Sequence, residues 1–208
     1  MKTIDRRAAR RLAIVKQRLT RERPAADAPG LLNLVRELGC LQIDPIRVVA
    51  RSHQIVLWSR VGRYDPADLD RLLWRDRSLF EYWAHAASIV PTADYPIHQH
   101  FMRRYATDRP GSQVGQRYIK WLAANRGLKR HILTELRRRG PLLSRELGAE
   151  DKVSDGWYST GWTSGRDVSQ MLDYLWTKGQ IMVAGRSGLQ KLWDRSEERR
   201  VGKECRSR

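Results

Sequence analysis

The chain has 208 residues, of which 41% are hydrophobic and 30% charged, as in ordinary globular proteins of one or two domains. Forty Lys and Arg residues against 23 Asp and Glu residues give a formal net charge of +17, and the isoelectric point is about 10.7. This excess predicts a polyanionic partner, and nucleic acid is the commonest one. The alternative is a basic surface that has no polyanionic ligand.

Several classes of protein are disfavoured by the sequence. No apolar run approaches membrane-spanning length, and the Arg-rich first 22 residues are typical of an amphipathic helix rather than a signal peptide. Cys40 and Cys205 lie far apart without a partnering motif, which favours a reducing cytoplasm over a disulfide framework. The five histidines are scattered and no Gly-rich phosphate loop is present, so we expect neither a metal nor another cofactor.

The C-terminal residues 195–208 form a segment of a different kind. They have no helical or strand periodicity, and they resemble a translated cloning or adaptor sequence. They contain six basic and three acidic residues, so the rest of the chain keeps a net charge of +14 of the total +17. We expect this segment to be a non-native tail and the natural protein to continue past Asp194.

The chain begins with a predicted amphipathic helix over residues 3–19, in which apolar side chains recur at helical spacing. Its outer side carries four arginines, which are Arg6, Arg7, Arg10 and Arg11. This cluster is either a solvated face or a contact with phosphates, and the sequence leaves both open. A linker rich in Pro, Ala, Asp and Gly follows at residues 24–30.

The rest of the first half predicts short helices and strands in alternation. A helix over residues 31–38 ends at Gly39, and a short strand covers residues 40–44. Ser52 is the expected N-cap of a helix over residues 53–60, and Asp65 with Pro66 begins another. Residues 79–91 have strand character, with Glu81, Trp83 and His85 on one face and Phe80 and Tyr82 on the other.

The second half predicts three helices followed by a β-hairpin. A long helix lies between residues 118 and 136, a short one over "LLSREL" (142–147), and a third over residues 168–176. Residues 179–194 predict two strands about a turn at 185–188. This is the order of a winged helix, a helix-turn-helix variant. The first half follows a similar plan, so we expect an α+β fold, mainly α with small β-hairpins, built as tandem winged-helix units over residues 1–110 and 111–194.

Gln42 and Asp44 are the most informative pair in the sequence. Residues i and i+2 of a strand point to the same face, so both side chains are expected to project together, opposite Leu41 and Ile43. A structural interpretation is also open: Asp44 could cap a helix that begins at Pro45, and Gln42 could satisfy a backbone group. The two interpretations are compatible, because an N-cap carboxylate stays ionised at the positive end of a helix.

Three segments carry a resemblance to a known family: "LQIDPIRVVARSHQIVLWSRVGRYDP", "LFEYWAHAASIVP" and "GWTSGRDVSQMLDYLWTKGQIMVAGRSGLQKLWD". Together they resemble the YcaQ/AlkZ-like winged-helix DNA glycosylases, which are linked to removal of N7-alkylpurines and unhooking of interstrand crosslinks. The signature of that family, Gln, an apolar residue and then Gln or Asp, falls on Gln42, Ile43 and Asp44. Family members are longer, with a third winged-helix unit and a β-rich C-terminal region, so the chain resembles a C-terminally truncated member.

The chemistry of such a reaction suits one carboxylate and one amide. A cationic N7-alkylpurine leaves without a strong general acid, through an oxocarbenium-like state. Asp44 is expected to stabilise this cation and activate water, and Gln42 to position the water. No lysine stands near the motif, so we expect a monofunctional glycosylase without a Schiff-base step.

The resemblance also suggests which residues contact DNA. The partner is expected to be double-stranded DNA with alkylated or crosslinked bases, bound by a cytoplasmic, nucleoid-associated monomer. The candidate contacts are basic or aromatic residues near the motif, and for the last four a structural role in the core or at a helix start stays open: Arg47, Arg51, Arg60, Tyr82, Trp83, His85 and His53. In the second unit, the helix near residues 166–178 is the expected groove or backbone element.

Two other functions remain open from the sequence. A non-enzymatic winged-helix regulator explains the charge and the hairpin, but not why a Gln and an Asp share one face of a strand. It predicts a preferred operator sequence, whereas a glycosylase prefers a lesion in any sequence. A protein-interaction module with a basic surface predicts no DNA binding at physiological salt.

Overall fold

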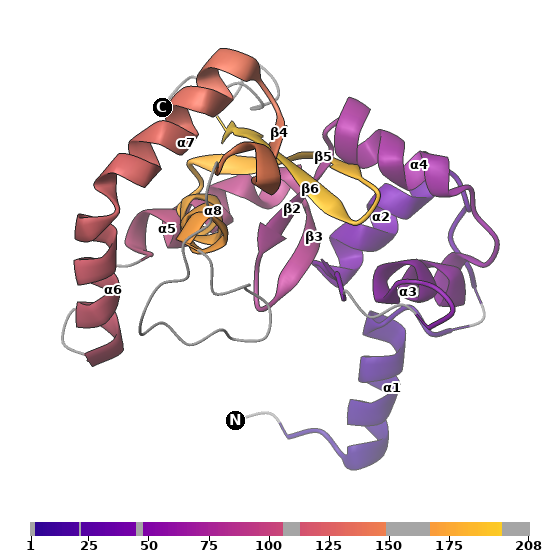
Figure 1. Ribbon diagram of the computed structural model, residues 1–208. Helices are drawn as coiled ribbons and strands as arrows, with labels where there is room; N and C mark the ends of the chain where they lie inside the picture. The colour runs from indigo at the N-terminus through magenta and orange to yellow at the C-terminus, as the bar shows by residue number, and fades with distance from the viewer. Residues whose placement is uncertain (1–2, 21, 45–47, 106–112, 149–166, 197–208) are drawn as a thin grey trace. The chain divides into compact units, whose positions relative to one another are not determined.

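The computed structural model describes residues 3–20, 22–44, 48–105, 113–148 and 167–196 (Figure 1). The chain divides into two compact units, Met1–Tyr95 and Pro96–Arg208, and each is considered by itself. Each unit combines helices with one small antiparallel sheet of three strands, so the predicted α+β fold class is confirmed. None of the described helices is both long enough and apolar enough to cross a membrane.

The first unit consists of helices around a sheet whose strands lie in the order β1-β3-β2. Its helices are α1 (Arg6–Lys16), α2 (Ala28–Leu38), α3 (Ser52–Val61) and α4 (Pro66–Asp70), which continues into a π-helical turn, η1 (Arg71–Arg75). Its strands are β1 (Leu41–Gln42), β2 (Leu79–Trp83) and β3 (Ala87–Pro91). A short 3₁₀ turn, η2 (Thr92–Asp94), leads into α5 (Tyr95–Arg104).

Helix ends in this unit follow the expected local chemistry. The Asp27 carboxylate caps α2 by accepting a hydrogen bond from the Gly30 N–H at 2.9 Å, and α2 ends at Gly39, whose φ of +80° favours glycine. Asp65 caps α4 by accepting from the Ala67 N–H at 2.9 Å, as predicted. These caps fix where the chain turns before and after the segment that contains Gln42 and Asp44.

The core of the first unit lies between α2 and one face of the sheet. The fully buried side chains include residues of α2, β1, α3, β2 and β3: Leu31, Leu34, Leu41, Leu57, Leu79 and Ile89. In the sheet register, Leu41 lies opposite Ile89, and Ile89 lies opposite Glu81. The next row, Gln42, Ser88 and Tyr82, therefore lies on the other face of the sheet, because successive side chains alternate.

Residues 79–91 have the predicted strand character, but they form the two strands of a hairpin, whose turn the sequence analysis did not place. Trp83 pairs with Ala87, and the Ala84 N–H donates to the Ala86 carbonyl at 3.0 Å, which closes a tight turn with His85 at its tip. Alanines and a histidine do not mark a turn in the way that Gly, Pro or Asn does, and this is why the sequence did not reveal it. Glu81, which was placed on one face with Trp83 and His85, is only 3% exposed.

The second unit is organised around a sheet in the order β4-β6-β5. Its described helices are α5, which belongs to this unit from Pro96 on, α6 (Gln113–Ala124), α7 (Arg126–Arg139) and α8 (Asp167–Thr177), with a 3₁₀ turn, η3 (Ser144–Glu146). Its strands are β4 (Leu142–Leu143), β5 (Ile181–Ser187) and β6 (Gln190–Arg195). The predicted third helix and terminal hairpin are thus present at close to their expected positions.

Two details of the second unit differ from prediction. The long helix is broken at Asn125, whose side-chain amide donates to the Trp121 carbonyl at 2.9 Å and whose backbone is not helical. The segment "LLSREL" is strand β4 and then the turn η3, since Leu142 and Leu143 pair with Trp193 and Leu192 of β6. The helix break depends on a side-chain hydrogen bond, and β4 depends on pairing with a strand that is distant in the sequence. Periodicity alone could therefore predict neither.

The predicted non-native tail overlaps the fold by two residues. Arg195 is the last residue of β6 and pairs with Ile181, and Ser196 is buried, where its hydroxyl donates to the Gly179 carbonyl at 2.6 Å. The rest of that segment, residues 197–208, lies outside the described residues. Arg195 and Ser196 are therefore part of the second unit.

The two units share one order of elements. In each, a helix is followed by a short strand, two further helical segments and a hairpin, and the short strand pairs with the last strand of the hairpin. In the first unit these are α2, β1, α3, α4–η1, β2 and β3; in the second they are α7, β4, η3, α8, β5 and β6. This common order is compatible with the winged-helix prediction, and the assignment of tandem winged-helix units stays a prediction.

Asp173 on α8 gives the second unit a testable pH dependence. Burial raises the pKa of this carboxyl to about 6, against the attraction of Lys191, which lowers it. A raised pKa means that the folded state favours the protonated form, so this stability is fully present below about pH 4 and is lost as pH rises through about 6. We expect Asp173→Asn to stabilise the chain at pH 7.5 by about 1–2 kcal/mol and much less at pH 4.

Urea unfolding followed by tryptophan fluorescence at both pH values measures this difference. An equal gain in stability at pH 4 and pH 7.5 would contradict the assignment, because the effect would then not depend on ionisation of Asp173.

Candidate functional site

Gln42 and Asp44 lie where an outer strand of the first sheet ends. Leu41 and Ile43 are buried in the core, Gln42 is exposed and Asp44 is half-buried. This is the alternation predicted from the sequence. The Ile43 N–H donates to the Ala87 carbonyl at 2.7 Å, so the pairing with β3 continues one residue beyond Gln42. The backbone on both sides of Ile43 is therefore fixed by the sheet.

Ser52, the first residue of α3, ties the backbone of this segment to the helix. Its hydroxyl donates to the Gln42 carbonyl at 2.9 Å and accepts from the Asp44 N–H at 3.1 Å. Ser52 was predicted to be the N-cap of this helix, but that position belongs to Arg51, whose N–H donates to Gln54 Oε1 at 3.2 Å. Asp44 does not cap α3, and residues 45–47 lie outside the described part of the chain.

His85 reaches Gln42 from the tip of the β2–β3 hairpin. Its Nε2 lies 3.4 Å from Gln42 Oε1, and its Nδ1 lies 3.9 Å from the Cys40 thiol. Cys40 and Gln42 are two residues apart and so flank the same side of the chain. The structure thus brings together Cys40, Gln42 and His85, although the sequence separates Gln42 from His85 by 43 residues.

This contact determines what the Gln42 amide can do. In the tautomer with the proton on Nε2, His85 donates to Gln42 Oε1, and Nδ1 can accept from the Cys40 S–H. The oxygen of the amide is then engaged, and the amide NH₂ remains to donate to a water or a substrate. Beside it, the half-buried Asp44 supplies a carboxylate that can accept a proton or stabilise a cation.

The aromatic candidates of β2 are placed in two environments. Tyr82 is 3% exposed and its ring lies 6.2 Å from that of Phe80, so the structure favours its alternative role in the interior. Trp83 is 40% exposed and remains accessible to a ligand, as does the exposed His85. Of the three residues of "EYWAH" proposed to contact DNA, two are at the surface.

The remaining candidates of the first unit also differ in accessibility. His53 is 7% exposed, so its ring cannot contact DNA without local rearrangement. The Arg60 guanidinium donates to the Gln17 carbonyl at 2.9 Å and to the Val56 carbonyl at 3.3 Å, and partial burial lowers its pKa. Arg51 is half-buried at the start of α3, and Arg47 lies outside the described residues. Arg60 therefore has a structural role in joining α1 to α3.

Helix α8 does not have the accessibility expected of a groove-reading helix. Most of its side chains are buried: Val168, Gln170, Met171, Leu172, Tyr174, Leu175 and Trp176. None of its residues belongs to the exposed class. At its C-terminal end, Lys178 Nζ donates to the Arg103 carbonyl at 2.9 Å. Burial therefore argues against α8 as a groove-reading helix, its contact with the DNA backbone stays a prediction, and Arg166 lies outside the described residues.

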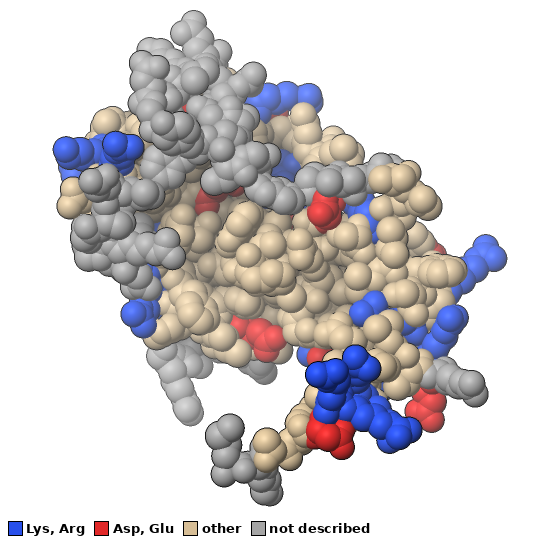
Figure 2. Space-filling view, turned by 90° about the horizontal axis from the view of Figure 1, so that it is seen from below, with Lys and Arg blue, Asp and Glu red and all other residues tan. Residues whose placement is uncertain are grey.

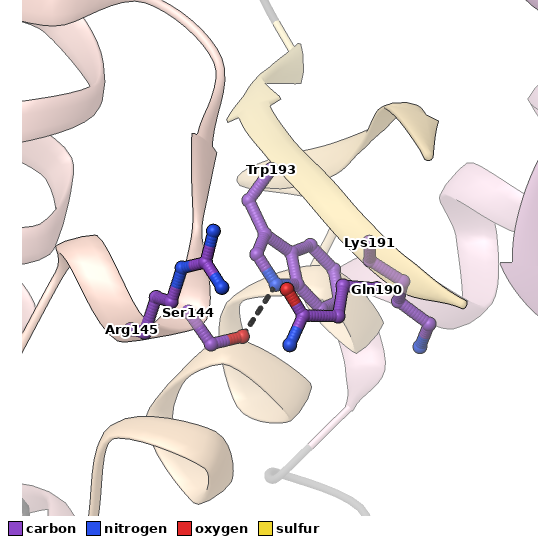
Figure 3. A pocket seen from close by; sticks show the side chains of 5 residues that line it. All are labelled: Ser144, Arg145, Gln190, Lys191 and Trp193. Atoms are coloured by element: carbon purple, nitrogen blue, oxygen red, sulfur yellow. Dashed lines mark hydrogen bonds between the residues drawn. The ribbon is translucent and has the colours of Figure 1, made fainter. Parts of the chain in front are cut away.

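A pocket of about 210 Å³ lies in the second unit, between η3 and strand β6 (Figure 3). It is lined by Ser144, Arg145, Gln190, Lys191 and Trp193. The Trp193 indole N–H donates to the Ser144 hydroxyl at 3.2 Å, and Lys191 Nζ lies 4.9 Å from the centre of the Trp193 ring. No residue predicted for the site lines this pocket, so it is separate from the Gln42–Asp44 segment.

Sequence reasoning missed the residues that support the motif. Ser52 was treated only as a helix cap, and Cys40 only as a reduced thiol. The sequence did not indicate that Glu81 is buried on the core face of the sheet. The i, i+2 spacing of Cys40 and Gln42 was the only available signal, because the contacts with Ser52 and His85 depend on tertiary structure.

Comparison with known proteins adds one positive finding. A family model described as "DNA glycosylase AlkZ-like" matches residues 35–206, which is most of the chain and includes all of the candidate site. The match also covers most of the segment predicted to be a non-native tail. No solved structure matches the chain.

Proposed function

Because the chain belongs to the family of AlkZ-like DNA glycosylases, we propose that it hydrolyses the N-glycosidic bond of N7-alkylated purines in double-stranded DNA. Family membership supports glycosylase activity on DNA, and the proposal adds the substrate and the residues. The observation that carries it is the Gln42–Asp44 segment, in which an exposed amide and a half-buried carboxylate are held by the sheet and by Ser52.

The proposed mechanism assigns one role to each of the two side chains. An N7-alkylated purine is already cationic, so its bond to the sugar breaks without a strong general acid, and positive charge develops on the sugar. The Asp44 carboxylate stabilises this charge and accepts a proton from the attacking water. The Gln42 amide donates to that water and holds it against the sugar. Water attacks the anomeric carbon as the neutral N7-alkylpurine leaves.

We assign His85 a positioning role in this scheme. By donating from Nε2 to Gln42 Oε1 at 3.4 Å, it would turn the amide NH₂ of Gln42 toward the water. This differs from the direct contact with DNA that was predicted for His85, although an exposed ring at a hairpin tip can serve both purposes. The two roles are separable by experiment.

The position of the motif also supports action on crosslinked bases. A crosslinked base is tethered to the opposite strand and cannot rotate fully into a pocket, so ordinary base flipping does not serve. Gln42 is exposed at the end of an outer strand, where it can approach a base that stays within the duplex. We further propose a monofunctional glycosylase built of tandem winged-helix units, which works as a monomer at the nucleoid in the cytoplasm.

The test is base release from a duplex that contains one N7-methylguanine. With excess protein and the whole 208-residue chain, we expect free N7-methylguanine and an abasic site, with no strand break before alkali treatment. Strand cleavage without alkali would contradict the monofunctional mechanism. Sequence-dependent binding of undamaged duplexes without base release would instead indicate the regulator. A second duplex with an N7-linked interstrand crosslink tests the unhooking reaction.

A further inference from the structure

Helix α1 carries the densest group of cations in the first unit. Within its 11 residues lie four arginines and one lysine, which are Arg6, Arg7, Arg10, Arg11 and Lys16, and no acidic residue. All five are exposed. Figure 2 shows Lys and Arg side chains gathered over this helix, at the lower right of the view. The helix therefore presents a positively charged surface of its own.

Among the described residues, these arginines differ from four other exposed arginines in having no acidic partner. Arg71 and Arg75 share Asp76 at 2.9 and 3.0 Å, and Arg138 and Arg139 share Glu135 at 2.9 and 3.4 Å. Among the described residues, the four arginines of α1 form no ion pair and no side-chain hydrogen bond. Their charge is therefore available to an external anion.

The spacing of the arginines suits an extended polyanion. Arg6 and Arg10 are four residues apart, as are Arg7 and Arg11, so they form two adjacent pairs on one side of the helix. A guanidinium can bind a phosphate through two hydrogen bonds, which lysine cannot do in the same geometry. Two neighbouring rows of guanidinium groups can therefore contact successive phosphates of a nucleic acid backbone.

Contacts at the C-terminal end of α1 join this surface to the candidate site. The helix has no buried residue, so packing contributes little to its position. The Arg60 guanidinium on α3 donates to the carbonyl and side chain of Gln17, at 2.9 and 3.3 Å, and Arg18 forms an ion pair with Glu37. Since α3 also begins with Ser52, α1 is attached to the helix that holds the Gln42–Asp44 segment.

We propose that α1 is a phosphate-binding arm, which binds the backbone of duplex DNA whether or not a lesion is present. This inference rests on the proposed function only in taking DNA as the ligand. The arm supplies sequence-independent affinity and its salt dependence, whereas Gln42 and Asp44 act on the damaged nucleotide.

The test compares two quadruple variants that change the net charge equally. The first replaces Arg6, Arg7, Arg10 and Arg11 with glutamine. The control replaces four ion-paired arginines with glutamine: Arg71, Arg75, Arg138 and Arg139. Binding of an undamaged 25-base-pair duplex is measured by fluorescence anisotropy between 50 and 300 mM salt, and circular dichroism checks that both variants are folded.

We expect the α1 variant to lose at least about 10-fold in affinity near 0.15 M salt, with the slope of log K against log salt reduced by about 2–4. The control is expected to change far less. Equal losses in the two variants would overturn the proposal, because net charge alone would then explain binding. Loss of binding to anionic lipid vesicles with unchanged binding to the duplex would also overturn it.

Base release separates this inference from the proposed function. With protein saturating the duplex, the defect of the α1 variant is expected in affinity rather than in the rate of N7-methylguanine release, because its arginines contact backbone phosphates whereas Gln42 and Asp44 act on the damaged nucleotide. A parent that binds the duplex through α1 yet releases no base would support the arm and overturn the glycosylase assignment.

Discussion

Asp44→Asn is expected to lower the single-turnover rate of N7-methylguanine release by about 10²- to 10⁴-fold, with little change in affinity for the duplex. The substitution keeps the size and shape of the side chain, but removes the negative charge and the base that accepts a proton from water. The Asp44 N–H bond to Ser52 is a backbone interaction and remains in the variant. The loss is therefore expected in the chemical step rather than in folding.

Asp65→Asn is the matched control for this experiment. It makes the same chemical change at an exposed Asp of the same unit, and Asn caps a helix about as well as Asp does. Quench-flow or gel assays with excess protein should give the parent rate for this control. A rate above about one tenth of the parent's for Asp44→Asn would contradict the assigned role, since a general base contributes more than that.

Burial explains which parts of the fold were predictable. The helices of residues 28–38 and 167–177 have an apolar face, and Gly39 marks the end of the first, so both were predicted, although α2 begins three residues earlier than expected, after Asp27. The break at Asn125 and the strand β4 were not predictable, because each depends on a bond that competes with helix periodicity or on pairing with β6. The hairpin at His85 lacked any residue that favours a turn.

In the candidate site, too, features set by local alternation were predictable and features set by tertiary contacts were not. The exposure of Gln42 and Asp44 followed from period-2 alternation in a short strand, because Leu41 and Ile43 had to enter the core. In β2 the two faces do not differ in burial, since Glu81 and Tyr82 lie on opposite faces and are both buried. No local pattern could show that Ser52 bonds the Gln42 backbone or that His85 approaches the Gln42 amide, since these contacts span 10 and 43 residues.

A double-mutant cycle on Gln42 and His85 is expected to show strong non-additivity. Gln42→Ala removes the donor that holds the water and should lower the single-turnover rate by about 10²-fold. His85→Ala removes one hydrogen bond to that amide and should lower the rate by about 10-fold. If His85 acts only through Gln42, the double variant is no slower than Gln42→Ala alone, and the coupling energy is about 1.4 kcal/mol.

The same cycle separates positioning from direct contact with DNA. A residue that positions Gln42 changes the rate at saturating protein and leaves duplex affinity intact, whereas a residue that contacts DNA weakens affinity and adds to the effect of Gln42→Ala. His85→Gln should recover part of the lost rate, because its amide can still donate toward Gln42 Oε1. His100→Ala, at an exposed histidine of α5, is the control. Additive losses with weakened binding would instead indicate that His85 contacts DNA directly. The Gln42 amide would then have to be oriented by Asp44 and water.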